Sequence, residues 1–136
     1  MARKSILILI VILVNILAIL FLIESYSVDK ELYANTFIVD AIYLKEEGYV
    51  EISFLDNSGK TKSVVLEILG MPESFQKKFI GSEFSERVSF FETPKYGWKT
   101  MPVTFVVDHE EFGIIGIKTE IHTPSEPPTP IIFSKI

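Results

Sequence analysis

The feature that most constrains this chain is an uninterrupted apolar segment near its N-terminus. Residues Ile6 to Ile23 read ILILIVILVNILAILFLI and include no charged side chain. At 1.5 Å per residue, a helix of this length spans about 27 Å, close to the thickness of the hydrocarbon core of a bilayer. A helix inside a globular protein is rarely apolar on every face. The segment therefore predicts one transmembrane helix, and we assign residues 1–24 to a membrane anchor.

The charges on either side of the apolar segment predict its orientation. Arg3 and Lys4 precede it, whereas acidic residues outnumber basic ones in residues 24–31. Basic residues flank membrane helices mainly on the cytoplasmic side, so we expect a single-pass protein of the cell membrane with a cytoplasmic N-terminus and an extracytoplasmic C-terminal domain. The alternative is a cleaved signal peptide, because Ser25 and Ser27 have the spacing that a signal peptidase accepts. The apolar segment is longer than that of a usual signal peptide, which favours the uncleaved anchor.

Composition narrows what the rest of the chain can be. About a hundred residues follow the anchor, enough for one hydrophobic core without cross-links. The chain has no cysteine, which excludes a disulfide scaffold and a thiolate metal site. Its net charge is -5 and it has no cluster of basic residues, which argues against nucleic acid as a partner. No Gly-rich phosphate loop is present, and we expect no cofactor.

After a polar linker at residues 25–36, residues 37–122 have the pattern of an antiparallel β domain. Runs of β-branched and aromatic residues recur between turn residues. The clearest example is a hairpin, in which Tyr49 to Leu55 alternates apolar and polar residues, Asp56 to Gly59 forms the turn, and Ser63 to Leu69 returns. The pattern predicts a curved sheet or half-barrel of about six strands, at residues 37–44, 49–55, 63–69, 84–91, 103–107 and 114–121.

One short helix is expected inside this domain. Pro72 is suited to the first turn of a helix, and Phe75 and Phe79 are four residues apart, on one helical face. Gly81 would end the helix. These elements predict an α+β domain in which a curved sheet wraps around one short helix.

Residues 123–136 form a proline-rich tail. Four prolines fall within residues 123–130, and proline favours an extended backbone that cannot form a central strand. Ile131, Ile132 and Phe133 follow as an apolar patch. This patch must either pack on the domain or meet a partner.

The order of residues between about 50 and 107 resembles the FKBP family of peptidyl-prolyl isomerases, including the isomerase domain of trigger factor. The segment that carries the resemblance is FQKKFIGSEFSERVSFFETPKYGW, and its landmarks are Leu69-Gly70, Phe75, Gly81, Val88 to Phe91, Pro94 and Tyr96-Gly97. The resemblance implies an aromatic pocket with Phe75 at its floor, the Tyr96 hydroxyl holding a substrate carbonyl, and Phe105 as a wall. Ile52 and Ser63 stand where the family has an aromatic and an acidic residue, so part of the pocket lining would be missing.

Each candidate site has a structural alternative. Phe75, Phe79, Phe90 and Phe105 are also what the core of a β domain requires. Asp108-His109-Glu110-Glu111 collects residue types that bind divalent cations, but charged residues are also expected at a turn between strands, and we expect no metal site. Composition leaves a Ser-His-Asp arrangement open, yet the chain has no G-x-S-x-G nucleophile elbow.

A loop composition typical of interaction surfaces completes the sequence evidence. Tyr96, Trp98 and Met101 lie close together with Gly97 and Pro102. If Trp98 and Met101 were exposed beside Ile131, Ile132 and Phe133, they would form a docking patch. We therefore predict a non-catalytic, membrane-anchored accessory or interaction protein, whose partner is another membrane or exported protein. The alternative is an FKBP-like isomerase or chaperone that acts on exported proteins.

Overall fold

The structure is a computed structural model that describes the backbone of residues 2–136 and the side chains of residues 3–21 and 29–136. The chain divides into two compact units, one ending at Tyr33 and the other running from Ala34 to Ile136. Each unit is described by itself.

The first element is a single long helix, α1 (Ala2–Thr36). Its stretch from Arg3 to Phe21 has a mean hydropathy of 2.8, no side chain buried within the chain, and enough length to cross a membrane. The predicted apolar helix is therefore present. The helix also continues through residues 25–36, where the sequence suggested a linker, because this stretch has no proline or glycine to break it. At 1.5 Å per residue, the continuation adds about 20 Å of helix beyond the apolar segment.

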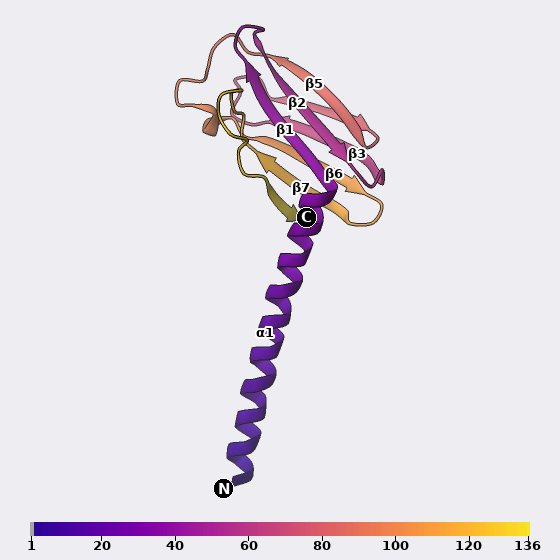
Figure 1. Cartoon of the computed structure of the whole chain (residues 1–136), viewed down its shortest axis with the longest axis vertical. Coiled ribbons are helices and arrows are strands. Elements are labelled where there is room, and N and C mark those ends of the chain that lie inside the picture. Colours follow the sequence, from indigo (N-terminus) through magenta and orange to yellow (C-terminus); the bar gives the residue numbers. More distant parts are fainter. Residues whose placement is uncertain (1) are drawn as a thin grey trace. The chain divides into compact units, whose positions relative to one another are not determined.

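The second unit is a pair of antiparallel β-sheets that do not close into a barrel (Figure 1). The smaller sheet has the order β1-β2-β5 and consists of β1 (Phe37–Leu44), β2 (Tyr49–Asp56) and β5 (Glu83–Ser89). The larger sheet has the order β4-β3-β6-β7-β8 and consists of β4 (Phe75–Ile80), β3 (Thr61–Ile68), β6 (Val103–His109), β7 (Gly113–Thr119) and β8 (Ile132–Lys135).

Alternation of apolar and polar residues explains why these strands form and which way they face. In β1 the residues Phe37, Val39, Ala41 and Tyr43 are buried, and the residues between them are not. Side chains of a strand alternate between faces, so each such strand has one apolar face. The two apolar faces meet in the core, where the ring of Phe54 lies 6.1 Å from that of Phe105 across the sheets. The general prediction of an antiparallel β domain is confirmed.

Three details of the prediction are wrong. The domain has eight strands in two sheets rather than about six in one curved sheet. The predicted helix over Phe75 and Phe79 is strand β4, paired with β3 through Ile68 and Phe75. Residues four apart share a face in a strand as well as in a helix, so the spacing of the two phenylalanines did not distinguish the two structures. Within residues 37–136, the one helical turn is the 3-10 turn Trp98–Thr100.

The predicted hairpin of residues 49–69 is the third error. β2 pairs with β1 and β5, whereas β3 pairs with β4 and β6, so residues 57–60 form a corner between the sheets. Both strands bury alternate residues, and that pattern does not reveal which strands are neighbours. The actual hairpin joins β1 and β2 through a turn that ends at Gly48, whose φ of 76° favours glycine.

The two ends of the β domain carry different loops. At the junction end, the Asn57 N–H donates to the Thr36 carbonyl at 2.9 Å, which places the corner between the sheets beside the end of α1. At the far end lie the β1–β2 turn (residues 45–48) and the long loop of residues 90–102 (Figure 1). The strap (residues 120–131) connects β7 to β8 and forms a parallel bridge to β1 between Ile42 and His122. The proline-rich tail thus packs on the domain and ends in an edge strand.

Candidate functional site

The loop of residues 90–102, at the far end of the β domain, carries exposed aromatic side chains. Phe91 is 88% exposed and Tyr96 is 77% exposed, although both lie in a loop that is tied to the domain. Phe90 is buried and its N–H donates to the Gly48 carbonyl at 2.9 Å, so the start of the loop is fixed on the β1–β2 turn. Phe91 follows directly and must point the other way.

Trp98 packs on β1 and thereby fixes the second half of the same loop. Its ring is half-buried, 4.9 Å from the ring of Tyr43 and 5.5 Å from the ring of Phe90. Hydrogen bonds from Gly97 to the Pro94 carbonyl and from the Thr100 hydroxyl to the Gly97 carbonyl close the intervening turns. The loop therefore holds Phe91 and Tyr96 in place without burying them.

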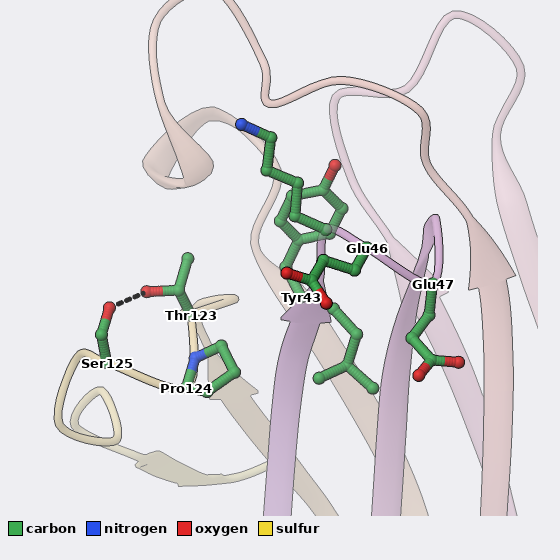
Figure 2. A pocket seen from close by; sticks show the side chains of 8 residues that line it. Tyr43, Glu46, Glu47, Thr123, Pro124 and Ser125 are labelled. Carbon is green, nitrogen blue, oxygen red and sulfur yellow. Dashed lines mark hydrogen bonds between the residues drawn. The ribbon is translucent and has the colours of Figure 1, made fainter.

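A shallow pocket of about 400 Å³ opens beside this loop (Figure 2). One wall is the end of β1 and the turn after it, and the other is the strap. The lining residues are Tyr43, Leu44, Lys45, Glu46, Glu47, Thr123, Pro124 and Ser125. The hydroxyl oxygens of Thr123 and Ser125 are hydrogen-bonded to each other at 3.2 Å (Figure 2). The Thr123 hydroxyl also donates to the Glu126 carboxylate at 2.7 Å. The pocket lining is mixed, with apolar surface from Tyr43, Leu44 and Pro124 and charged groups of both signs from Lys45, Glu46 and Glu47.

A buried histidine holds the strap side of this pocket against β1. His122 Nε2 lies 2.7 Å from Asp40 Oδ1, and Nδ1 lies 2.9 Å from the Thr123 carbonyl oxygen. Both partners are acceptors, so the doubly protonated ring satisfies both bonds. Burial alone lowers the pKa of His122, but the hydrogen bonds to Thr123 and Asp40 and the charge of Asp40 outweigh burial and raise it. The ring, bonded through both nitrogens, therefore ties the strap to β1.

A second histidine network lies at the junction end. His109 and Asp56 are buried, with Nε2 3.2 Å from Oδ2, and the Ser58 hydroxyl lies 3.1 Å from the same ring nitrogen. Asp56 also accepts hydrogen bonds from the Ser58 hydroxyl and the Thr61 hydroxyl, each at 2.6 Å. Burial raises the pKa of Asp56, but these bonds, the Ser58 N–H and the nearby His109 together lower it below its ordinary value.

This Ser-His-Asp grouping does not have the geometry of a catalytic triad. The other ring nitrogen of His109, Nδ1, accepts the N–H groups of Glu111 and Phe112, each at 3.1 Å, so it carries no proton. The proton of the neutral ring is then on Nε2, and a general base needs a free lone pair directed at the serine. Ser58 also donates to Asp56 rather than to the ring. The network ties the corner between the sheets to the β6–β7 turn.

The acidic stretch of residues 108–111, at the end of β6, does not converge on a metal position. His109 points into the core, and Glu111 pairs with Lys60 at 3.0 Å on the surface. Across the side chains of residues 3–21 and 29–136, no group of three His, Cys, Asp or Glu residues is arranged to hold a metal ion.

The three residues assigned to an isomerase pocket lie in different environments. Phe105 is fully buried between Phe54 and Phe84 in the core. Phe75 is half-buried on the edge strand β4, and Tyr96 is exposed in the far-end loop with the Lys95 ammonium 5.5 Å from its ring. Among the described side chains, no ring contact joins any two of Phe75, Tyr96 and Phe105. Isomerase activity stays a prediction to be tested.

The interaction candidates from the sequence are also separated. Trp98 packs on β1, whereas Met101 lies beside Gly70 at the end of β3. Ile131 and Ile132 are exposed at the start of β8, and Phe133 is half-buried opposite Ile117. The sequence prediction omitted Phe91, although two consecutive phenylalanines at the end of an alternating strand imply that one of them faces outward.

Comparisons of this chain with family models, with curated proteins and with solved structures found no match. Its function is therefore proposed from residues and geometry.

Proposed function

We propose that this chain is a membrane-anchored, non-catalytic interaction protein whose β domain binds another protein through its far end, outside the cytoplasm. The observation that carries the proposal is the pair Phe91 and Tyr96, exposed to 88% and 77% on a loop that the packing of Trp98 supports. Aromatic side chains are enriched among the residues that dominate binding energy at protein interfaces.

The support beneath the loop matters for affinity. A loop that is already fixed loses less conformational freedom on binding than a mobile loop does. Trp98, the bond from Phe90 to Gly48 and the turns at Gly97 fix the backbone on both sides of Phe91 and Tyr96. The adjoining pocket contributes Lys45, Glu46 and Glu47, and the Lys95 ammonium lies 5.5 Å from the Tyr96 ring, so charges of both signs border the exposed aromatic side chains. The partner surface is therefore expected to combine an apolar centre with charged residues of both signs around it.

The long helix supplies the anchor in this proposal. The apolar stretch of α1 would cross the membrane, with Arg3 and Lys4 on the cytoplasmic side. Anchoring raises the effective concentration of the domain near partners in the same membrane. If the segment were instead a cleaved signal sequence, the same domain would be released, and it would bind without this advantage.

A photo-crosslinking experiment tests the proposal. Benzoylphenylalanine would replace Phe91 in the full chain, and Ile80, which is 79% exposed at the junction end, would carry the same group as a matched control. We expect irradiation of intact cells to give a discrete adduct with one protein from position 91 and none from position 80.

Binding measurements on the identified protein complete the test. The full chain in nanodiscs should bind it, and the double variant Phe91→Ser/Tyr96→Ser should bind at least tenfold more weakly, a loss of about 1.4 kcal/mol. Ile80→Ser should bind like the wild type. Equal adducts from positions 91 and 80, or equal affinity of the double variant, would refute the proposal.

A further inference from the structure

The four edges of the two sheets are protected to different degrees. β1 is bridged by the strap, and beside the bridge the Asp40 carboxylate accepts the Ala41 N–H at 2.9 Å. β8 is only four residues long. β4 carries the consecutive lysines Lys77 and Lys78, two like charges that discourage the pairing of an edge strand, whereas the exposed charges of β5, on Glu83 and Arg87, are of opposite sign. β5 has seven regularly paired residues and no cover over its outer edge in the described part of the chain (Figure 1).

Two hydrogen bonds establish which backbone groups of β5 are free. The Asp56 N–H donates to the Ser82 carbonyl at 2.8 Å, and the Phe90 N–H donates to the Gly48 carbonyl at 2.9 Å. These bonds lie just beyond the two ends of β5, and both involve even-numbered residues directed at β2. Backbone groups alternate in direction along an antiparallel strand, so the odd-numbered residues direct their N–H and C=O groups away from the sheet. These residues are Glu83, Ser85, Arg87 and Ser89.

An incompletely covered apolar seam lies beside this edge. Phe75 and Phe79 of β4 and Phe84 of β5 are half-buried, and the rings of Phe79 and Phe84 stack with centroids 3.8 Å apart. Lys77 Nζ pairs with Glu86 Oε2 at 2.6 Å in the same row. We call these five residues the β4–β5 seam. A further strand beside β5 would place every second side chain over the seam, and would thereby bury apolar surface as well as satisfy the backbone groups.

We propose that β5 is a docking edge that binds an extended segment of a partner protein as an additional β-strand. This inference takes one point from the proposed function, namely that the β domain binds another protein. β5 leads through Phe90 directly to Phe91, so a strand along this edge reaches the exposed aromatic loop. A partner that contacts the far end could therefore continue along β5.

The side chains of β5 specify the chemistry of the added strand. Residues over the seam should be apolar, because Phe79 and Phe84 lie there. On the outer face, an antiparallel strand should place a carboxylate opposite Arg87 and a basic residue opposite Glu83. The occupant is thus an extended segment with alternating apolar and polar residues, acidic toward its N-terminal end and basic toward its C-terminal end.

A synthetic peptide with this pattern provides the test. The peptide TVEVTIK places its glutamate opposite Arg87 and its lysine opposite Glu83 when it runs antiparallel to β5. TVKVTIE has the same composition with the charges exchanged. Fluorescence anisotropy of each labelled peptide would be measured against the full chain in nanodiscs. We expect saturable binding of TVEVTIK and at least about tenfold weaker binding of TVKVTIE.

Proline substitutions identify the edge. Ser85→Pro removes an N–H that faces away from the sheet, a position at which an edge strand tolerates proline. Lys78→Pro is the matched control on β4, because the bond from the Gly81 N–H to the Lys62 carbonyl shows that the even-numbered residues of β4 face outward. Ser85→Ala controls for the loss of the hydrogen bond from the Ser85 hydroxyl to Glu51. Only Ser85→Pro should lower peptide affinity, by at least about tenfold, while near-ultraviolet circular dichroism stays that of the wild type.

The outcomes separate this inference from the proposed function. Lack of saturable binding of TVEVTIK, or equal binding to Ser85→Pro, overturns the docking edge. Loss of binding in both proline variants also overturns it, because the effect would then not be specific to β5. Self-association that is abolished by Ser85→Pro would show that the edge pairs with a second copy of the chain, which contradicts a separate partner. The variants of Phe91 and Tyr96 still test the far end, whichever result the peptide gives.

Discussion

Replacing Asp56 with alanine should destabilise the β domain more than any substitution at an exposed position. The Asp56 carboxylate accepts hydrogen bonds from the Ser58 N–H and hydroxyl and from the Thr61 hydroxyl, and it faces His109 Nε2 at 3.2 Å. Removing it leaves the buried Thr61 hydroxyl without its acceptor, and leaves His109 Nε2 only the Ser58 hydroxyl oxygen, 3.1 Å away. An unsatisfied buried polar group costs about 1–3 kcal/mol, and the combined loss should be about 3–5 kcal/mol.

The single tryptophan provides the assay. Trp98 lies at the far end between Tyr43 and Phe90, so its fluorescence reports unfolding of the whole domain rather than a local change at Asp56. Urea unfolding of the full chain in nanodiscs would be followed by this signal. Ser58→Ala is the matched control and should lose only about 1 kcal/mol, because its hydroxyl is near the surface. A loss below about 1 kcal/mol in Asp56→Ala would refute the role of the network.

Three further predictions follow from the same structure. Because folding lowers the pKa of Asp56, the ionised Asp56 carboxylate should stabilise the β domain at pH values above its unfolded pKa of about 3.9. This stabilisation should be lost as the pH falls through the folded pKa, and urea unfolding of Asp56→Asn should lack this dependence on pH. Because folding raises the pKa of His122, the protonated His122 ring should stabilise the β domain below its unfolded pKa of about 6.5, and this stabilisation should be lost as the pH rises through the folded pKa. In Asp40→Asn, the free energy of unfolding should fall less over this rise in pH. Phe105→Ala should cost about 3–5 kcal/mol in the urea assay, whereas Phe91→Ala should change stability by less than about 0.5 kcal/mol; similar losses would show that the core and the surface have been misassigned.

The isomerase alternative requires its own measurement. The full chain in nanodiscs would be added to a chymotrypsin-coupled assay with an Ala-Leu-Pro-Phe peptide. We expect no acceleration of prolyl isomerisation, because Phe105 is buried in the core and Tyr96 is exposed. Acceleration that disappears in Tyr96→Ala would instead establish an isomerase pocket.

Local patterns in the sequence were sufficient for the elements whose structure depends on neighbouring residues. The apolar run from Ile6 specifies a helix, and alternation in residues 37–44 and 103–119 specifies strands with one buried face. The turn between β6 and β7 was also predictable, because it separates two adjacent alternating runs. In each case, one physical rule acts over fewer than twenty or so residues.

The pairing of strands depends on contacts that the sequence does not display. β2 and β3 look like a hairpin, but the carboxylate of Asp56 bonds to Ser58 and Thr61 and stabilises a corner between sheets instead. Phe75 and Phe79 fit a helix or a strand equally well, and pairing with β3 decides for the strand. The two histidine networks join residues 51 and 82 positions apart, which no local pattern could reveal.

The sequence indicated that an aromatic loop could form an interaction surface, but not which aromatic side chains of the loop are exposed. The loop around Tyr96 and Trp98 has the composition of an interaction surface, yet Trp98 supports the loop from below and Phe91 is the more exposed residue. Which aromatic side chain faces outward depends on the contacts of Phe90 and Trp98 with β1 and its turn. Those contacts exist only once the two sheets have formed.

Cysteine labelling in intact cells tests the central claim most directly. The chain has no cysteine, so single substitutions Tyr96→Cys, Ile80→Cys and Ser5→Cys give a signal without background. With a membrane-impermeant maleimide, Ile80→Cys should react at once, Ser5→Cys only after the membrane is permeabilised, and Tyr96→Cys slowly in cells but fully in the purified protein. Equal labelling of Tyr96→Cys and Ile80→Cys in cells would contradict a covered far end. Failure of both to react before permeabilisation would contradict an extracytoplasmic domain.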